Sequence, residues 1–294
     1  MNPLDFMYPL DALLMFAIAI GWGMALSRRY NLRWSLWGIG AATFFLSQVV
    51  HLPLLAVVRK LLYGGAPPGG WEPSPAAFVG YALLLGLLAG LSEEILRYAV
   101  LRWWAREARS WKQALMFGAG HGGLEALILG ALLLVNFFAM LAIRDVDLRT
   151  LVPADQLALA QAQVRAFWGV AWWMPLLGAW ERFWTLPVHV FLAVLVMRAF
   201  THRKRGYLLA AIGWHTLVDA GAVMAVQTWG AVPTEGLVTV FGGLSLLGIF
   251  LLREADPLTV EAASGEANPP ENPSVLPLPL DVDDDTLENS RYLS

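Results

Sequence analysis

Long apolar runs separated by short basic clusters dominate the pattern of this chain. Several runs approach or exceed the roughly 20 uncharged residues that a helix needs to cross a bilayer. The pattern predicts an all-α, polytopic helical membrane protein of about seven transmembrane helices, or eight if residues 157–180 also cross. The predicted spans are 10–27, 34–58, 77–101, 112–140, 176–198, 206–228 and 235–252.

Three other features complete the predicted organisation. Repeated Gly and Pro make 64–70 a loop, and Pro187 is expected to break the span that contains it. Gln and Arg among Leu and Ala are typical of an interfacial helix at 157–171. We expect a transmembrane domain over 1–252, with its functional core at about 77–228, and a disordered, acidic, Pro-rich tail over 253–294.

Basic residues next to the spans predict the orientation. Arg28 and Arg29 end the first run, and similar clusters follow the third and fifth runs. By the positive-inside rule these ends face the cytoplasm, which places the N-terminus outside and the C-terminus inside. The expected location is therefore the cell membrane (plasma or inner membrane), as a multi-pass protein.

Composition narrows the function classes. The chain is 57% hydrophobic and 15% charged, and it has no cysteine, which excludes disulfides, thiolate nucleophiles and cysteine metal ligands. The tail holds ten acidic and two basic residues, so the membrane part keeps 18 basic and 13 acidic residues. That balance suits anionic lipid headgroups, and nothing in the chain indicates a nucleic-acid partner.

The adjacent pair Glu93 and Glu94 stands inside an otherwise apolar run. A carboxylate at mid-membrane costs roughly 2.5–3.5 kcal/mol on insertion scales, so such residues commonly have a function. Four titratable residues lie nine or ten positions from a basic boundary, about 14 Å along a helix and near the middle of the bilayer. These four residues are Glu93, His121, His189 and His215. Their common depth predicts one buried site.

Helical spacing adds partners to this site. His121 and Glu125 share a helix face, as do His215 and Asp219. Arg97 can reach either glutamate of the pair. Arg182 lies two turns before His189 on the same face, and glycines around His121 permit close approach of another helix.

Each residue also has a purely structural interpretation. The glutamates and Arg97 could form an ion pair that locks two helices, and each histidine could be a hydrogen-bonded core residue. Gln48 and His51 in the second span have no strong partner at helical spacing, so we expect them to be structural. The common depth favours a functional site for the other groups.

Buried carboxylates and imidazoles suit the activation of water, with a glutamate as base and histidines as oxyanion and proton donors. The same groups could bind zinc, although the His-Glu-x-x-His pattern is absent. A proton-coupled transporter or a membrane scaffold is the non-enzymatic alternative.

Three motifs carry a family resemblance: Glu93-Glu94-x-x-Arg97, Phe117-x-x-x-His121 and His215-x-x-x-Asp219. In order and spacing they resemble the CAAX-prenyl endopeptidase and bacteriocin-processing superfamily of intramembrane peptidases. The likeness is greatest to its PrsW-type and YhfC-type branches, which also show a glutamate like Glu125 and an Arg…His motif like Arg182 and His189. The prenyl-protein branch has three residues between its glutamate pair and its Arg, where this chain has two. Its closing motif usually has an Asn where this chain has Asp219.

The resemblance implies a glutamic intramembrane endopeptidase that cleaves a protein or peptide substrate in or near the bilayer. Glu93 or Glu94 would activate water, and the three motif histidines would stabilise the oxyanion and transfer protons. No cofactor is expected under this interpretation. In the zinc-dependent alternative, His121, His189 and His215 would bind the metal with Glu93 or Glu94.

Overall fold

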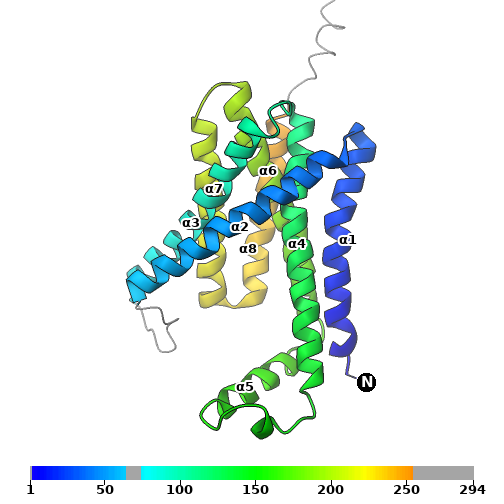
Figure 1. The fold of residues 1–294 in the computed structure, drawn as a ribbon, viewed down its shortest axis with the longest axis vertical. Helices are drawn as coiled ribbons and strands as arrows, with labels where there is room; N and C mark the ends of the chain where they lie inside the picture. Colours follow the sequence, from blue (N-terminus) through cyan, green and yellow to red (C-terminus); the bar gives the residue numbers. More distant parts are fainter. Residues whose placement is uncertain (1, 64–73, 254–294) are drawn as a thin grey trace, which may run out of the picture. The chain divides into compact units, whose positions relative to one another are not determined.

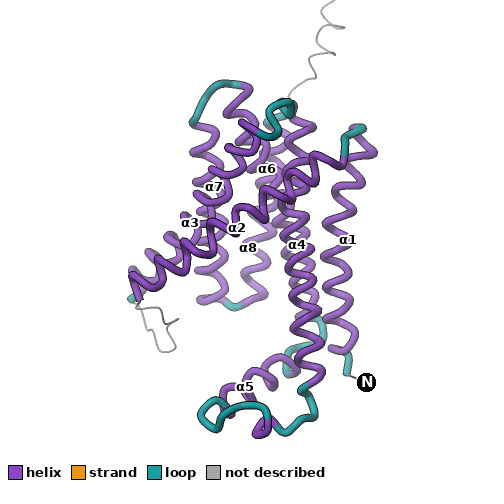
Figure 2. The backbone as a smooth tube through the Cα atoms, in the orientation of Figure 1, coloured by secondary structure: helices purple, strands orange, loops and turns teal. Residues whose placement is uncertain are grey.

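The structure, a computed structural model, describes residues 2–63 and 74–253, and these residues are helical with short connections and no strand. Figures 1 and 2 show the arrangement. The helices are α1 (Leu4–Tyr30), α2 (Trp34–Tyr63), α3 (Pro75–Trp103), α4 (Trp111–Ala142), α5 (Leu157–Trp168), α6 (Leu177–Thr201), α7 (Gly206–Trp229) and α8 (Ala231–Leu251). Short 3-10 turns lie at Leu148–Thr150 and Met174–Leu176.

The prediction of seven spans is confirmed. Within the described residues, seven helices are long and apolar enough to cross a membrane, and α5 with its 12 residues is not one of them. The predicted loop 64–70 and the predicted disordered tail, apart from Arg253, lie outside the described residues.

The prediction of a break at Pro187 was wrong, because α6 runs without interruption from Leu177 to Thr201. Proline removes one backbone hydrogen bond, but Pro187 and the residues that follow it are buried against neighbouring helices. Leu186, Val188 and His189 are all buried next to the proline. Tight packing therefore holds the helix through a residue that would end an exposed one.

The helices pack around α6, which has the largest buried share among the described spans. It contacts α4, α7 and α8, while α1 lies along α4 and α3 lies along α7 (Figure 1). Helix α2 runs obliquely across the others and packs on both α4 and α3. This oblique helix therefore connects the pair α1 and α4 with the pair α3 and α7.

Glycines allow the backbones of α2 and α4 to touch. A Cβ atom added to Gly120 would lie 1.9 Å from the carbonyl oxygen of Trp37, and one added to Gly40 would lie 2.0 Å from that of Phe117. Gly118 likewise approaches Val190 of α6, where an added Cβ would lie 2.6 Å from its Cα. The predicted role of the glycines around His121 in close helix packing is thus confirmed.

Polar contacts tie the two ends of the bundle. At the basic end, Nε1 of Trp111 donates to the Ile249 carbonyl at 3.0 Å, and Nη1 of Arg198 donates to that of Leu252 at 2.8 Å. At the opposite end, the buried carboxylate of Asp11 accepts the backbone N–H of Ala179 at 2.7 Å and so caps α6 from another helix.

Helix α5 is attached at this opposite end. The hydroxyl of Tyr8 donates to the carbonyl of Phe167 at 2.8 Å. Arg144 pairs with Asp5 and stacks over the ring of Trp168, with its guanidinium carbon 3.5 Å from the ring centroid. The helix predicted at 157–171 is therefore present and fixed to α1 and the end of α4.

We predict that Gly120→Ala destabilises the protein by about 1–3 kcal/mol, because the methyl group would force α2 away from α4. Gly38→Ala is the matched control on α2, since no described atom would lie within 4 Å of its Cβ. This control should be neutral or slightly stabilising, because alanine favours helix. Thermal unfolding in detergent measures both variants, and equal stability of the two would contradict the close packing.

Candidate active site

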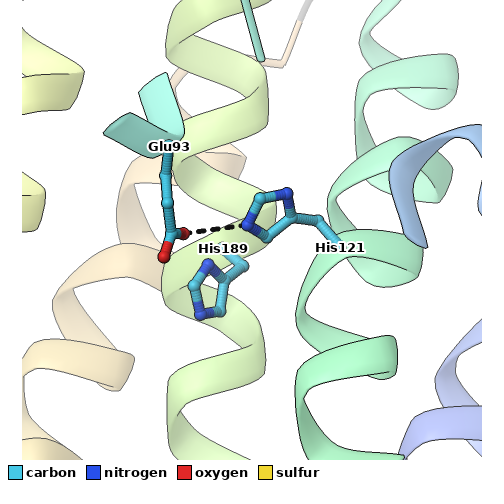
Figure 3. A group of neighbouring side chains, drawn as sticks. All are labelled: Glu93, His121 and His189. Atoms are coloured by element: carbon cyan, nitrogen blue, oxygen red, sulfur yellow. Dashed lines mark hydrogen bonds and ion pairs between the residues drawn. The ribbon is translucent and has the colours of Figure 1, made fainter. Parts of the chain in front are cut away.

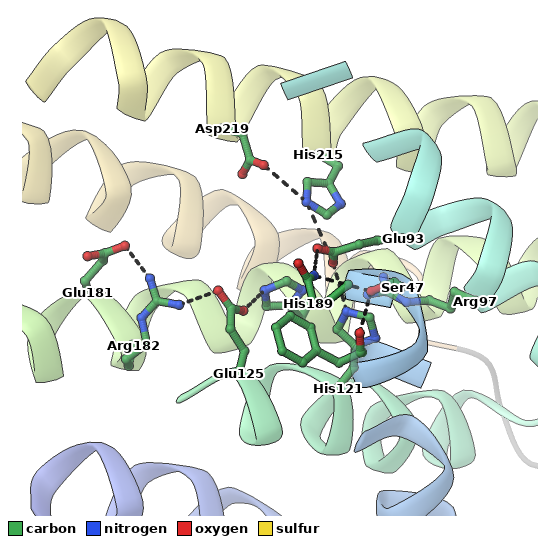
Figure 4. A network of polar contacts seen from close by, with 12 residues as sticks. Ser47, Glu93, Arg97, His121, Glu125, Glu181, Arg182, His189, His215 and Asp219 are labelled. Carbon is green, nitrogen blue, oxygen red and sulfur yellow. Dashed lines mark hydrogen bonds and ion pairs between the residues drawn. The ribbon is translucent and has the colours of Figure 1, made fainter. Parts of the chain in front are cut away.

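Four helices bring the predicted titratable residues together in one cluster (Figure 4). Glu93 comes from α3, His121 from α4, His189 from α6 and His215 from α7. All four are buried, with exposed fractions of 8% or less. The neighbouring imidazole rings have centroids 5.2 Å apart for His121 and His189, and 6.0 Å apart for His189 and His215.

Glu93 lies at the centre of the cluster. Its Oε2 atom is 2.9 Å from Nε2 of His121 (Figure 3) and 3.9 Å from Nε2 of His215. Its Oε1 atom accepts a hydrogen bond of 3.1 Å from Nε2 of Gln48 on α2. The carboxylate therefore contacts three helices besides its own.

Glu94 has a different environment, because successive residues of a helix point about 100° apart. Its side chain is fully buried between Nη1 of Arg97 and Nδ1 of His215, each 2.9 Å away. Arg97 thus pairs with Glu94 and not with Glu93. The structural ion pair considered from the sequence exists for Glu94, and it also holds one nitrogen of His215.

Glu125 connects Arg182 with His189. Its Oε1 atom is 2.6 Å from Nη1 of Arg182, and its Oε2 atom is 2.6 Å from Nε2 of His189. Glu181 binds the other side of the Arg182 guanidinium. Asp219 lies 3.5 Å from Nε2 of His215 and keeps 38% of its side chain exposed.

A cavity of about 190 Å³ adjoins the cluster, and Glu93, His189 and His215 line it. A cavity this large and polar has room for several water molecules. It extends to Glu181 and Asp219, whose side chains are 39% and 38% exposed. These two residues lie farther from the basic ends of their helices than the histidines do. The cavity therefore runs from mid-bundle toward the end opposite the basic clusters.

Among the residues that the structure describes, two groups could hold a metal ion: Glu93 with His121 and His189, and Glu93 with Glu94 and His215. The predicted set of three histidines with one glutamate is not gathered in one group: Glu93 belongs to both groups, but His215 joins the one that contains Glu94, whose Oε1 lies 2.9 Å from its Nδ1. In the second group a cation would also lie close to Arg97, which already neutralises Glu94.

The first group fits zinc better. Two imidazoles and a carboxylate are a common ligand set of catalytic zinc. His189 places one nitrogen against Glu125, as metal-bound histidines commonly do, while its buried Nδ1 finds no partner among the described residues. The residues present therefore suit such an ion.

The sequence did not assign two contributors to the site: Gln48, which we expected to be structural but which contacts Glu93, and Glu181, which binds Arg182. Gln48 follows the basic residue Arg33 by 15 positions, about 22 Å along a helix, so the depth criterion did not include it. Because α2 is inclined (Figure 1), distance along this helix overstates depth. Glu181 was overlooked because its position, next to Arg182 near the start of α6, gives no distinctive spacing.

Comparison with known proteins agrees with this architecture. The sequence model of the family described as "YhfC intramembrane metalloprotease" matches residues 14–241, which include every helix that supplies the cluster. The "Uncharacterized membrane protein YhfC" of Bacillus subtilis (strain 168) is 30% identical over 232 residues, or 73% of this chain and 82% of that protein. No solved structure matches. The chain therefore belongs to the YhfC intramembrane metalloprotease family.

Proposed function

We propose that this chain is an intramembrane endopeptidase in which Glu93 activates water to hydrolyse a peptide bond in or near the bilayer. The observation that carries the proposal is the position of this carboxylate. It lies buried at mid-bundle, on a polar cavity with room for water, and histidines from other helices surround it. The family description supports the same reaction class.

In the proposed reaction, Glu93 takes a proton from a water molecule while the oxygen of that water forms a bond to the scissile carbonyl carbon. His121 and His189 are the proposed donors for the oxyanion that develops. His215 has a carboxylate beside each ring nitrogen, Glu94 at 2.9 Å and Asp219 at 3.5 Å, and is the proposed proton donor to the leaving amine as the C–N bond breaks. Glu93, His189 and His215 line the cavity, and His121 reaches it through its contact with Glu93.

A metal-dependent version is the second candidate, and the ligand set together with the family description favours it. Glu93, His121 and His189 would hold a zinc ion, which would polarise the carbonyl and lower the pKa of bound water. In this version Glu125 orients His189 through the contact at Nε2.

The transporter alternative loses support. A proton-coupled transporter was suggested by buried acids next to a broken helix, but α6 is continuous through Pro187. The wider relation to CAAX-prenyl endopeptidases and PrsW-type peptidases remains a proposal, based on the order of the three motifs. The proposed partners are a membrane-embedded or membrane-proximal peptide and the lipid around it.

Glu93→Gln should abolish cleavage, with a loss of at least about 100-fold, because the amide cannot accept the proton from water. Purified protein would be incubated with a library of transmembrane and prenylated peptides, and products would be identified by mass spectrometry. Glu107→Gln is the matched control, since this exposed glutamate lies at the basic end, away from the cavity. Cleavage that survives Glu93→Gln would refute the assigned role.

Metal analysis separates the two versions of the mechanism. If Glu93 acts without metal, cleavage should be unchanged after dialysis against a strong chelator. If zinc is required, the same treatment should abolish cleavage, and added zinc should restore it. The zinc content of the purified protein should then fall in His189→Ala. Zinc bound in equal amount by wild type and His189→Ala would exclude the proposed ligand set.

The absence of native cysteine makes single-cysteine labelling a direct test of the cavity. In intact cells, a membrane-impermeant thiol reagent should label Ala222→Cys, which lines the cavity, because the cavity runs toward the outer end in the proposed orientation. Leu132→Cys on the exposed apolar face of α4 should react slowly, since the thiolate form needs water. Ser35→Cys at the basic end should react only after permeabilisation. If Ser35→Cys reacts in intact cells and Ala222→Cys does not, the orientation is the opposite of the proposed one.

A further inference from the structure

Helix α2 supplies the one described contact to Oε1 of Glu93. We propose that Gln48 is a positioning residue, which fixes the carboxylate of Glu93 so that Oε2 faces His121 and the cavity. The inference rests on the proposed peptidase function and adds a fifth helix to the site. Nothing in the spacing of the motifs or in the family description assigns a role to this residue.

The contact has the geometry of a fixed hydrogen bond. Nε2 of Gln48 donates to Oε1 of Glu93 at 3.1 Å and lies 3.4 Å from Oγ of Ser47. Ser47 is itself fully buried and donates to the carbonyl of Phe44 at 2.6 Å. The amide therefore belongs to a short polar chain within α2.

One face of α2 brings both Gln48 and its neighbours to the site. Gly40, Phe44 and Gln48 follow one another at four-residue spacing, so they form one stripe along the helix. At Gly40 the backbone touches α4, and an added Cβ would lie 3.1 Å from the backbone nitrogen of His121. The ring of Phe44 meets the His121 imidazole edge-on, with centroids 5.3 Å apart. The same stripe thus supports both His121 and Glu93.

The consequence for catalysis follows from the freedom of a glutamate side chain. The terminal torsion of glutamate is broad, so a carboxylate bound at one oxygen alone can rotate away from its partner. Gln48 holds the second oxygen with a neutral donor and adds no charge to the buried site. In the metal-dependent version, the same bond would orient a ligand carboxylate from the outer shell. The inference therefore holds for either mechanism.

The test compares three substitutions of Gln48 on the peptide that wild-type protein cleaves from the transmembrane and prenylated library. Gln48→Met keeps the length and removes the donor, so kcat should fall about 10- to 100-fold with little change in KM. Gln48→Asn keeps the donor on a shorter side chain and should retain more activity than Met. Gln48→Glu places a second carboxylate beside Glu93 and should be the least active.

A structural role for Gln48 predicts a different result. In that case activity would follow stability, and the Asn variant would gain nothing over Met at equal thermal stability. Thr43→Val is the matched control, because among the described residues the hydroxyl of this fully buried residue of α2 bonds only within its own helix, to the carbonyl of Ile39. It should change the unfolding temperature but not kcat.

The outcomes separate the two proposals. Cleavage that depends on Glu93 but is equal in wild type and Gln48→Met overturns the role of Gln48 alone. Wild-type protein that shows no cleavage dependent on Glu93 overturns the peptidase function and this inference together. A fall in kcat in Gln48→Met that matches the fall in Thr43→Val at the same loss of stability also refutes positioning.

Discussion

The high free energy of a carboxylate in a lipid-embedded bundle is the constraint on which this structure depends. An unpaired charge there costs several kcal/mol, so each buried acid must find a cation, a hydrogen-bond donor or water. Glu94 satisfies this requirement with Arg97, and Glu125 with Arg182. Glu93 has no arginine partner among the described residues; it has the amide donor of Gln48, the imidazole of His121 at 2.9 Å, and a cavity with room for water. The three neighbouring acids are therefore not equivalent, and Glu93, which is not bound to an arginine, is the one to which we assign the proposed reaction.

The different environments of these three acids explain why several helices contribute to the site. The glutamates of the two ion pairs have their charges compensated by arginines, and each of them also holds an imidazole. Glu94 contacts Nδ1 of His215, and Glu125 contacts Nε2 of His189. His189 keeps an Nδ1 atom without a partner among the described residues, and Nε2 of His215 lies between Asp219 at 3.5 Å and Glu93 at 3.9 Å. In the proposed function, such an arrangement would position the reacting groups on rigid helices through supporting contacts, as catalytic sites require. The paired acids are thus part of the support for Glu93 and do not compete with it.

Helix packing sets the position of this cluster as much as the charges do. Glycines bring α4 against both α2 and α6, and a methyl group at Gly118 or Gly120 would collide with the neighbouring backbone. Without that approach, His121 could not face Glu93 across the bundle. The proline in α6 is tolerated for a related reason, since it is buried with the residues from Leu186 to Val190 and this packing keeps its segment helical. Close packing here does not serve stability alone, because it determines the distances within the site.

The sequence by itself determined the helices and the common depth of Glu93, His121, His189 and His215, because both follow from periodicity and from distance along single helices. It also identified the pairs within one helix face, such as His215 with Asp219. The tertiary structure alone decided that Arg97 pairs with Glu94, that His215 lies outside the group formed by Glu93, His121 and His189, and that Gln48 reaches the central carboxylate. Those results depend on the rotation and tilt of one helix relative to another. Packing of whole helix faces sets these two variables, and no local spacing encodes them.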